Sequence, residues 1–282
     1  MRIAILHGRV IDPVARTDRI EPIYLADGLV AAVGDAPAGF RADRTIEASG
    51  LVVAPGLIDL NARLREPGQE HKATLDSELR AAVAGGVTRL ACPPDTDPPL
   101  DEPGLVEMLT RRARHANRAH VHPVGALTSG LEGAALAEMG ELADAGCVAY
   151  SQGDAPLPEA LVILRAMQYA WTFRHRVWLR PQGASLARGG VAHDGEIATR
   201  LGLPAVPACA ETVALATILA LARETGVSVH LQRLSTAEGV AMVRDAKRAG
   251  LAVTAEVAAH HLPLCDVDLG WVDAQARFDP PL

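Results

Sequence analysis

The sequence predicts an α/β protein, a (β/α)8 TIM barrel that stops after its seventh strand and follows a small β-rich portion. From Leu51 onward, short apolar runs alternate with amphipathic helical stretches, a rhythm typical of parallel strands joined by right-handed helical crossovers. Several helical stretches end at glycine, the residue that often follows the last turn of a helix. No G-x-G-x-x-G motif follows the first barrel strand, which disfavours an open dinucleotide-binding sheet.

The first 52 residues are expected to form the β-rich portion. Short alternating stretches predict strands within residues 2–12, 20–34 and 44–56. The pairs Asp27-Gly28 and Gly34-Asp35 are turn signals within this region. We expect a small β-unit that is not stable on its own.

Residues 53–282 are expected to form the incomplete barrel. The seven strand candidates are short apolar runs at residues 51–60, 86–93, 119–127, 146–152, 175–181, 226–234 and 250–257. Helical stretches lie between them at Glu102–Arg114, Gly133–Ala145, Pro158–Phe173, Ala210–Thr225 and Ala237–Ala249. The chain stops at RFDPPL, so no residues remain for an eighth strand. Because a barrel without one strand exposes two parallel edges, we expect a piece of a longer protein; closure by another element is the alternative.

Composition and charge exclude several classes of protein. A chain of 282 residues with 49% hydrophobic residues can form one large core, or one domain with a small appendage. A formal net charge of -7 disfavours a nucleic-acid binder, which normally presents a basic face. The N-terminus does not resemble a signal peptide, and no apolar run is long enough to span a bilayer. We therefore expect a cytoplasmic protein.

The cysteines are far apart in the sequence and form no C-x-x-C pair: Cys92, Cys147, Cys209 and Cys265. We expect them to be reduced and individually buried, as in a cytoplasmic protein. Cys92 lies at the end of a predicted strand and is a weak candidate nucleophile, because a buried cysteine on a strand is usually inert.

Polar residues follow the predicted barrel strands, at the ends where barrel enzymes place their active sites. The stretch PGLIDLNARLREPG, residues 55–68, indicates a buried strand that runs into a polar loop. Asn61 and Arg63 lie two residues apart at its end, so their side chains are expected to point to the same face. The other polar candidates at strand ends are Asp59, Arg65, Asp95, Ser151, Gln152, Asp154, Arg180, Gln182, His230, Arg233, Glu256, His260 and His261.

These strand ends lie in blocks that resemble a known family. The segments PGLIDLNARLREPG, GGVTRLACPPDTDPP, GALTSGLEG, HLQRLSTAEG and TAEVAAHHLPL resemble, in order, blocks of the dihydroorotases of the amidohydrolase superfamily. The resemblance implies a zinc-dependent barrel of the metallo-dependent hydrolase type, with a small β-domain made from both chain ends. It is closest to the non-catalytic dihydroorotase-like subunits, or pseudo-dihydroorotases, that assemble with aspartate carbamoyltransferase in some bacteria.

The positions that the resemblance assigns to zinc ligands carry other residues. In catalytic members the first strand carries His-x-His, the fourth an aspartate, and the fifth and sixth one histidine each. The matching residues in this chain are Asn61, Arg63, Gln152, Arg180 and Arg233. A zinc ligand must offer a lone pair, whereas a guanidinium stays protonated and has no acceptor. The general-base aspartate of the family falls beyond Leu282, so we expect no catalytic residue, no metal and no cofactor.

Three residues remain candidates for binding substrate or another anion: Arg65, Asp95 and His260. By the resemblance, Arg65 stands where the family holds the dihydroorotate carboxylate, and Asp95 replaces an asparagine that contacts substrate. The alternatives are an ion pair of Arg65 with Glu66 or Asp59, and packing of His260 at the barrel rim.

Inward-pointing arginines require neutralisation. The three guanidiniums at ligand positions are expected to face the barrel interior, where carboxylates or a bound anion must balance them. The available carboxylates are Asp59, Asp95 and Asp154. His230 is expected to form hydrogen bonds inside the barrel.

Three functions are consistent with these observations. The first, which we expect, is a non-catalytic dihydroorotase-like subunit in pyrimidine biosynthesis, in a hetero-oligomer with the catalytic chain of aspartate carbamoyltransferase. The second is an active zinc-dependent dihydroorotase or related cyclic amidohydrolase. It requires a relocated metal site, and the residues available for one are His260, His261, Asp59 and Asp154. The third is a regulatory anion site, lined by Arg63, Arg65, Arg180 and Arg233.

Overall fold

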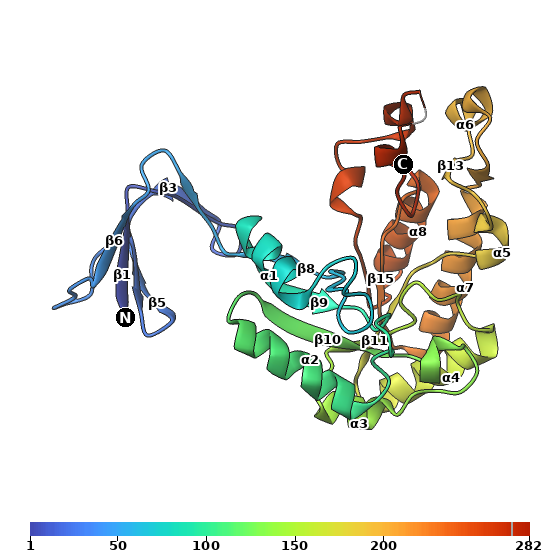
Figure 1. Ribbon diagram of the computed structural model, residues 1–282, viewed down its shortest axis with the longest axis horizontal. Coiled ribbons are helices and arrows are strands. Elements are labelled where there is room, and N and C mark those ends of the chain that lie inside the picture. Colours follow the sequence, from blue (N-terminus) through green and yellow to red (C-terminus); the bar gives the residue numbers. More distant parts are fainter. Residues whose placement is uncertain (272) are drawn as a thin grey trace. The chain divides into compact units, whose positions relative to one another are not determined.

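A computed structural model describes residues 1–271 and 273–282 of the chain (Figure 1). The chain divides into two compact units, Met1–Leu57 and Ile58–Leu282. The first unit consists of short strands, and the second consists of strands alternating with helices.

The first unit contains two small sheets. Its strands are β1 Arg2–Leu6, β2 Arg9–Asp12, β3 Thr17–Ile20, β4 Ile23–Ala26, β5 Leu29–Val33, β6 Arg44–Glu47 and β7 Val52–Val53. They pair in the orders β5-β4-β1-β6 and β3-β2-β7. Asp27 and Gly28, with φ angles of 53° and 80°, form the predicted turn between β4 and β5. The apolar side chains buried in this unit are few and small: Ala4, Val10 and Ala48.

The second unit contains the seven predicted barrel strands in one curved sheet. They are β8 Leu57–Asp59, β9 Val87–Cys92, β10 His120–Ala126, β11 Ala149–Ser151, β12 Arg176–Leu179, β15 Ser228–Leu231 and β16 Val253–Ala255. The order β8-β9-β10-β11-β12-β15-β16 follows the chain, and each registered pair from β9 to β16 is parallel. The sheet curls without closing, as expected for a barrel truncated after its seventh strand (Figure 1).

Most of the helices pack on the outer side of the curved sheet (Figure 1). These helices are α1 Leu75–Ala84, α2 Pro103–Ala116, α3 Met139–Asp144, α4 Ala160–Thr172, α7 Cys209–Thr225 and α8 Ala237–Arg248. The two other helices, α5 Ala184–Ala187 and α6 Glu196–Leu201, pack against α7 and the short strands that follow β12. The short elements are β13 Ala192–His193, β14 Ala205–Val206 and the 3-10 turns Ser129–Leu131, Ala259–His261, Asp266–Leu269 and Ala274–Ala276. None of the helices just given is both long and apolar enough to cross a membrane.

Four helices differ from the sequence prediction, since α3 begins later than expected and α1, α5 and α6 were not predicted. α3 begins at Met139 rather than Gly133, because the preceding backbone pairs elsewhere: Ala137 N–H donates to Leu127 O at 3.2 Å. α1 is a further helix, begun by a capping box in which Thr74 and Ser77 satisfy each other's backbone N–H groups.

The main core lies between the helices and the outer face of the sheet. Its fully buried side chains include Leu79 of α1, Leu109 of α2 and Met167 of α4. A second cluster fills the inner face of the sheet, and its members are Ala91, Val124, Ala149 and Trp178. Burial on both faces explains the continuous apolar runs of these strands.

Strand β8 is the exception to this burial. Leu57 and Ile58 are 61% and 62% exposed, so the expectation of a buried first strand is wrong. The physical reason is that β8 lies at one edge of the sheet and pairs with β9 alone.

Candidate functional site

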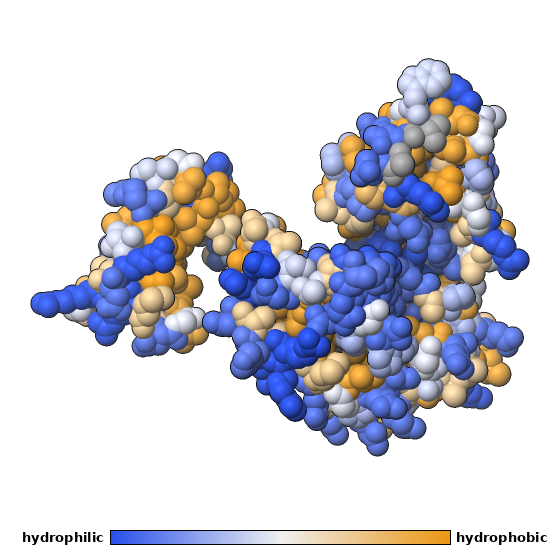
Figure 2. Space-filling model, viewed as in Figure 1, coloured by the Kyte–Doolittle hydropathy of each residue, from blue (hydrophilic) through white to orange (hydrophobic). Residues whose placement is uncertain are grey.

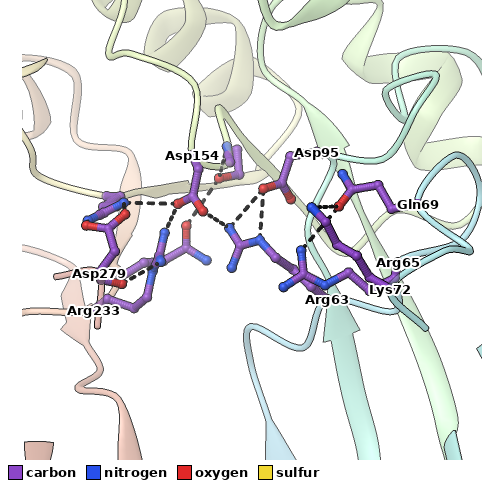
Figure 3. A network of polar contacts seen from close by, with 12 residues as sticks. Arg63, Arg65, Gln69, Lys72, Asp95, Asp154, Arg233 and Asp279 are labelled. Atoms are coloured by element: carbon purple, nitrogen blue, oxygen red, sulfur yellow. Dashed lines mark hydrogen bonds and ion pairs between the residues drawn. The ribbon is translucent and has the colours of Figure 1, made fainter. Parts of the chain in front are cut away.

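Four charged side chains meet where strands of the second unit end (Figure 3). Arg63 lies four residues after β8, Arg180 directly after β12, and Arg233 two residues after β15. Asp154 follows β11 by three residues. The C-terminal ends of parallel strands share one edge of a sheet, and this geometry brings residues from distant parts of the sequence together.

The Asp154 carboxylate bridges the three guanidiniums. Its Oδ2 lies 2.6 Å from Arg63 Nη2, and its Oδ1 lies 3.2 Å from Arg180 Nη1. Arg233 Nη2 donates to the same Oδ1. The arginine side chains are between 6% and 18% exposed, whereas that of Asp154 is 37% exposed. Cations buried to this extent need carboxylate partners, because little solvent reaches them.

Two further aspartates complete the arrangement. Asp95 Oδ2 accepts a hydrogen bond from Arg63 Nε at 2.9 Å. Asp279 Oδ2 accepts from Arg180 Nη1 at 2.8 Å, and Asp279 O accepts from Arg233 Nη1 at 3.1 Å. Three guanidiniums therefore face three carboxylates, and their formal charges cancel. We call these six residues the arginine–aspartate network: Arg63, Asp95, Asp154, Arg180, Arg233 and Asp279.

The network confirms Asp95 and Asp154 as carboxylate partners of the arginines. Asp59 has another role, since its Oδ1 accepts from the main-chain N–H of Asn61 at 2.8 Å. Asp279 is the partner that sequence reasoning missed. It lies in the RFDPPL segment, which carries no helix or strand periodicity to indicate where its carboxylate points.

Burial and neighbouring charges shift the pKa values of two members of the network, Arg233 and Asp279. Burial, and then the positive charge of Arg63, lowers the pKa of Arg233 to about 10. Burial alone would raise the pKa of Asp279, but the hydrogen bond and charge of Arg180 bring it below its usual value. Both groups therefore remain charged at neutral pH, and neither is suited to transfer protons there.

A glycine permits the loops that carry Asp95 and Asp154 to approach. Gly153 has φ +60°, a left-handed conformation that side chains rarely adopt. A Cβ at Gly153 would lie 3.0 Å from Asp95 Cβ, closer than ordinary packing allows. Glycine at this position thus keeps the centre of the network compact.

Gln152, the residue at the ligand position of the fourth strand, holds a loop. Its side chain is buried, with Nε2 donating to Leu131 O at 2.8 Å. Its Oε1 accepts from Thr128 Oγ1 at 3.0 Å. Both ends of the amide are engaged by the protein itself.

Asn61 and Arg63 do not share the face of a strand, because β8 already ends at Asp59. Both residues lie in the following loop, so the expectation drawn from strand alternation is wrong. Arg63 reaches the network, and Asn61 Oδ1 is buried without a hydrogen-bond partner among the described residues.

Arg65 lies apart from the network (Figure 3). Its Nη1 donates to Gln69 Oε1 at 3.3 Å, and Lys72 Nζ donates to the same oxygen at 3.1 Å. Arg65 does not pair with Glu66, because the buried Glu66 carboxylate pairs with Arg112. The four arginines predicted to line one anion site therefore do not lie together. Three of them are paired with aspartates, and Arg65 lies in a separate loop.

The adjacent histidines pack against the C-terminal segment. The His260 ring stacks on Phe278, with ring centroids 4.0 Å apart and planes 16° apart. His261 Nε2 lies 3.1 Å from Pro281 O. Burial, and then the charge of His261, lowers the pKa of His260. These contacts agree with packing at the rim of the sheet.

His230 forms the expected hydrogen bonds on the inner face of the sheet. Its Nδ1 lies 2.8 Å from Thr254 Oγ1, and its Nε2 lies 3.2 Å from Glu256 Oε2. The ring also packs against Trp178, at a centroid distance of 5.1 Å. Both ring nitrogens are thus engaged within the protein.

The cysteines differ in exposure. Burial raises the pKa of Cys92 to about 12, so its thiol is not a nucleophile at neutral pH. Cys92 is buried as expected and Cys147 is half-buried, whereas Cys209 and Cys265 are exposed, so the expectation of burial is wrong for these last two. They lie at the beginnings of α7 and of a 3-10 turn rather than on an apolar helix face.

The side chains at these strand ends do not fit a zinc ion. Within residues 1–271 and 273–282, no group of three or more His, Cys, Asp and Glu side chains is arranged to hold a metal. Guanidiniums have no lone pair to donate, and the nearby carboxylates are already engaged by them. Of the residues available for a relocated site, Asp154 is held by the arginines and Asp59 accepts from the main-chain N–H of Asn61. His260 Nε2 and His261 Nδ1 are buried without a hydrogen-bond partner among the described residues, but neither carboxylate is grouped with them at a metal site.

Known proteins resemble this chain over its whole length. A family model described as dihydro-orotase-like matches residues 50–239. A dihydroorotase-like protein of Pseudomonas putida is 47% identical over 282 residues, covering 100% of this chain and 66% of the relative. A dihydroorotase-like protein of Pseudomonas aeruginosa is 44% identical, covering 100% of this chain and 67% of the relative. A dihydroorotase of Syntrophus aciditrophicus is 37% identical, covering 100% of this chain and 66% of its own length.

Solved structures agree on the fold. An L-hydantoinase from Arthrobacter aurescens superposes with a TM-score of 0.78 at 21% identity, covering 95% of this chain and 60% of that chain. A D-hydantoinase superposes with a TM-score of 0.74 at 22% identity, covering 100% of this chain and 63% of that chain. The chain thus spans about two thirds or less of the proteins it matches.

Proposed function

The chain belongs to the dihydroorotase-like family, and from this premise we propose that it is a non-catalytic member. Its role is that of a cytoplasmic structural subunit, which assembles with the catalytic chain of aspartate carbamoyltransferase in pyrimidine biosynthesis. The observation that carries the proposal is the arginine–aspartate network at the strand ends.

The network opposes metal-dependent hydrolysis for two reasons. Hydrolysis of a cyclic amide at neutral pH needs an activated water and a group that polarises the carbonyl, which a bound metal supplies in such barrels. Here each central guanidinium repels a divalent cation and offers it no lone pair. The carboxylates that could attract a cation are bound to those guanidiniums, so a metal would have to break several ion pairs to enter.

The assembly role is supported by what the chain retains. The barrel strands, their order and the helices over them persist, whereas the ligand positions carry Asn61, Arg63, Gln152, Arg180 and Arg233. A scaffold preserved around an altered centre suits a protein that acts through its surface. The identity of the partner comes from the family resemblance.

An active zinc-dependent dihydroorotase is the second candidate. The observation that favours it is that several relatives, 37–41% identical to this chain, are named dihydroorotase. This candidate requires metal ligands that are not found among the described residues. It also requires that the three arginines either leave the strand ends or take part in the reaction.

Two measurements on the purified full chain test the proposal. The first is hydrolysis of dihydroorotate after incubation with zinc, beside a dihydroorotase of known activity. The second is complex formation with the aspartate carbamoyltransferase catalytic chain, followed by light scattering during gel filtration. We expect no turnover above the protein-free control, and a complex of defined mass. Turnover with one zinc per chain would establish the second candidate instead, and absence of a complex would remove the assembly role.

A further inference from the structure

The second half of α2 and the start of β10 carry unbalanced positive charge. Between Glu107 and Glu132 the sequence contains no aspartate or glutamate. The basic residues in this interval are Arg111, Arg112, Arg114, His115, Arg118, His120 and His122. In a chain whose formal net charge is -7, this interval stands out as a local cationic surface.

All of these residues except Arg112 line one of two adjoining hollows. One cavity of about 370 Å³ is lined by Arg114, Arg118, His120 and His122, among others. A second cavity, of about 460 Å³, shares Arg114 with the first and continues to Arg111 and His115, with Glu107 also on its wall. Figure 2 shows strongly hydrophilic surface over α2. We call the two adjoining hollows together the basic groove, defined by Arg111, Arg114, His115, Arg118, His120 and His122.

The arginines of the basic groove have no carboxylate partners within the described part of the chain. Arg112, on the same helix, pairs with the buried Glu66 and is thereby used in the fold. Arg111, Arg114 and Arg118 form no such ion pair with the residues that the structure describes. The part of the chain that the structure describes therefore leaves these three guanidiniums available to carboxylates from elsewhere.

The helix dipole of α2 explains the position of only some of the basic residues in the groove. Cationic side chains in the last turn of a helix interact favourably with its dipole, which suits Arg114 and His115. Arg118 lies beyond the C-cap residue, and His122 lies on β10. At that end, Arg89 Nη1 approaches His122 Nε2 to 3.4 Å, and burial, then Arg89, lowers the pKa of His122. The dipole of α2 therefore does not explain why Arg118 and His122 lie in the groove.

We propose that the basic groove is the docking surface for a segment of a partner protein rich in aspartate and glutamate. This inference rests on the proposed function, since a subunit that acts by assembly needs a docking face. Guanidiniums pair with carboxylates through two parallel hydrogen bonds, which gives such a contact direction as well as charge. An acidic segment limited to the groove avoids the negative remainder of the chain, whereas a long nucleic acid would face it.

Charge reversal on the full chain tests the docking surface. The Arg114→Glu/Arg118→Glu variant is compared with wild type for binding to the aspartate carbamoyltransferase catalytic chain at low and high salt. The matched control, Arg223→Glu/Arg244→Glu, makes the same charge change at exposed positions of α7 and α8. We expect the groove variant to bind about tenfold more weakly at low salt, mainly through a slower on-rate, and the control to stay within about twofold. Circular dichroism and thermal melts confirm that both variants fold.

The outcomes separate this inference from the proposed function. If wild type binds the carbamoyltransferase chain and both variants bind equally well, the groove is not the docking surface, and the assembly role stands. If wild type does not bind that chain, the assembly role fails. Binding of a fluorescent peptide of ten glutamates then tests whether the groove binds an acidic segment. The groove assignment then requires peptide binding that the groove variant loses and the control variant keeps. Tighter binding of a single-stranded oligonucleotide than of the peptide overturns it.

Discussion

Arg63 and Asp154 form an ion pair, with 2.6 Å between Nη2 and Oδ2, at the strand ends where a barrel hydrolase places its reactive centre. In a metal centre, a cation is held by neutral or anionic ligands. In this chain, the Asp154 carboxylate is held by three cationic side chains, so the charges are arranged in the opposite sense. The network links loops that follow β8, β11, β12 and β15, which gives it a structural role.

The first prediction concerns the shared carboxylate. Asp154→Asn removes a negative charge from three guanidiniums and turns an NH2 group toward them. We expect the free energy of unfolding to fall by about 2 kcal/mol, a value that allows for solvent screening at a partly exposed carboxylate. Urea denaturation measures the change. As a control, Asp245→Asn breaks an exposed pair with Arg248 and should cost less than about 0.5 kcal/mol.

The second prediction is a pH dependence. The pKa of Asp279 lies below its usual value: burial opposes this, and the hydrogen bond and charge of Arg180 produce it. Such a carboxyl stabilises the fold above its unfolded pKa of about 4, and the contribution is lost as the pH falls through the folded pKa. Asp279→Asn should therefore destabilise the protein at pH 7 and match wild type at the lowest pH. Urea midpoints of both proteins, measured from neutral to acid pH, check this; a difference that stays constant contradicts it.

The third prediction concerns a buried carboxylate that joins two helices. Glu211, in the first turn of α7, accepts from the backbone N–H groups of Ser235 and Thr236 at 2.8 and 3.3 Å. Glu211→Gln replaces one of these acceptor oxygens with a donor, so the free energy of unfolding should fall by about 2 kcal/mol. The matched change Glu224→Gln, at an exposed position of the same helix, should have little effect. If Glu211→Gln lowers the free energy of unfolding no more than Glu224→Gln does, the contact of Glu211 with Ser235 and Thr236 does not stabilise the fold as proposed.

The fourth prediction concerns thiol reactivity in the native protein. Cys209 and Cys265 are exposed and should react with iodoacetamide at a rate close to that of a small thiol. Burial raises the pKa values of Cys92 and Cys147 to about 12. The buried Cys92 should therefore remain unmodified until the protein is unfolded, and the half-buried Cys147 should react more slowly than Cys209 and Cys265. Peptide mass spectrometry after timed labelling distinguishes the sites. Rapid labelling of Cys92 would mean that the strand end is open and its thiolate accessible.

The barrel strands can be predicted from the sequence because strands buried on both faces carry continuous apolar runs. The strands from β9 to β16 that form the curved sheet lie within the predicted ranges, and α7 ends at Gly226, whose φ of +73° suits a glycine. The start of α3 cannot be predicted in this way. Residues 133–138 have a helical pattern, but their backbone groups bond to Leu127 and Ser129, which depends on the tertiary fold.

The site can be predicted in part for the same reason. Arg180 and Arg233 follow strands, and the ends of parallel strands converge in any barrel. Asp279 could not be placed, because its position depends on how a proline-rich segment folds back toward Arg180, 99 residues away in sequence. Arg65 follows the first strand too, yet its partner is Gln69 within its own loop, which periodicity cannot indicate.

Anomalous diffraction at the zinc absorption edge, from crystals of the full chain grown with zinc, tests the central claim most directly. We predict no anomalous peak among Arg63, Arg180 and Arg233, and electron density for the ion pairs of these side chains with the aspartates. A zinc peak between those strand ends, with protein ligands at coordination distance, would contradict the account.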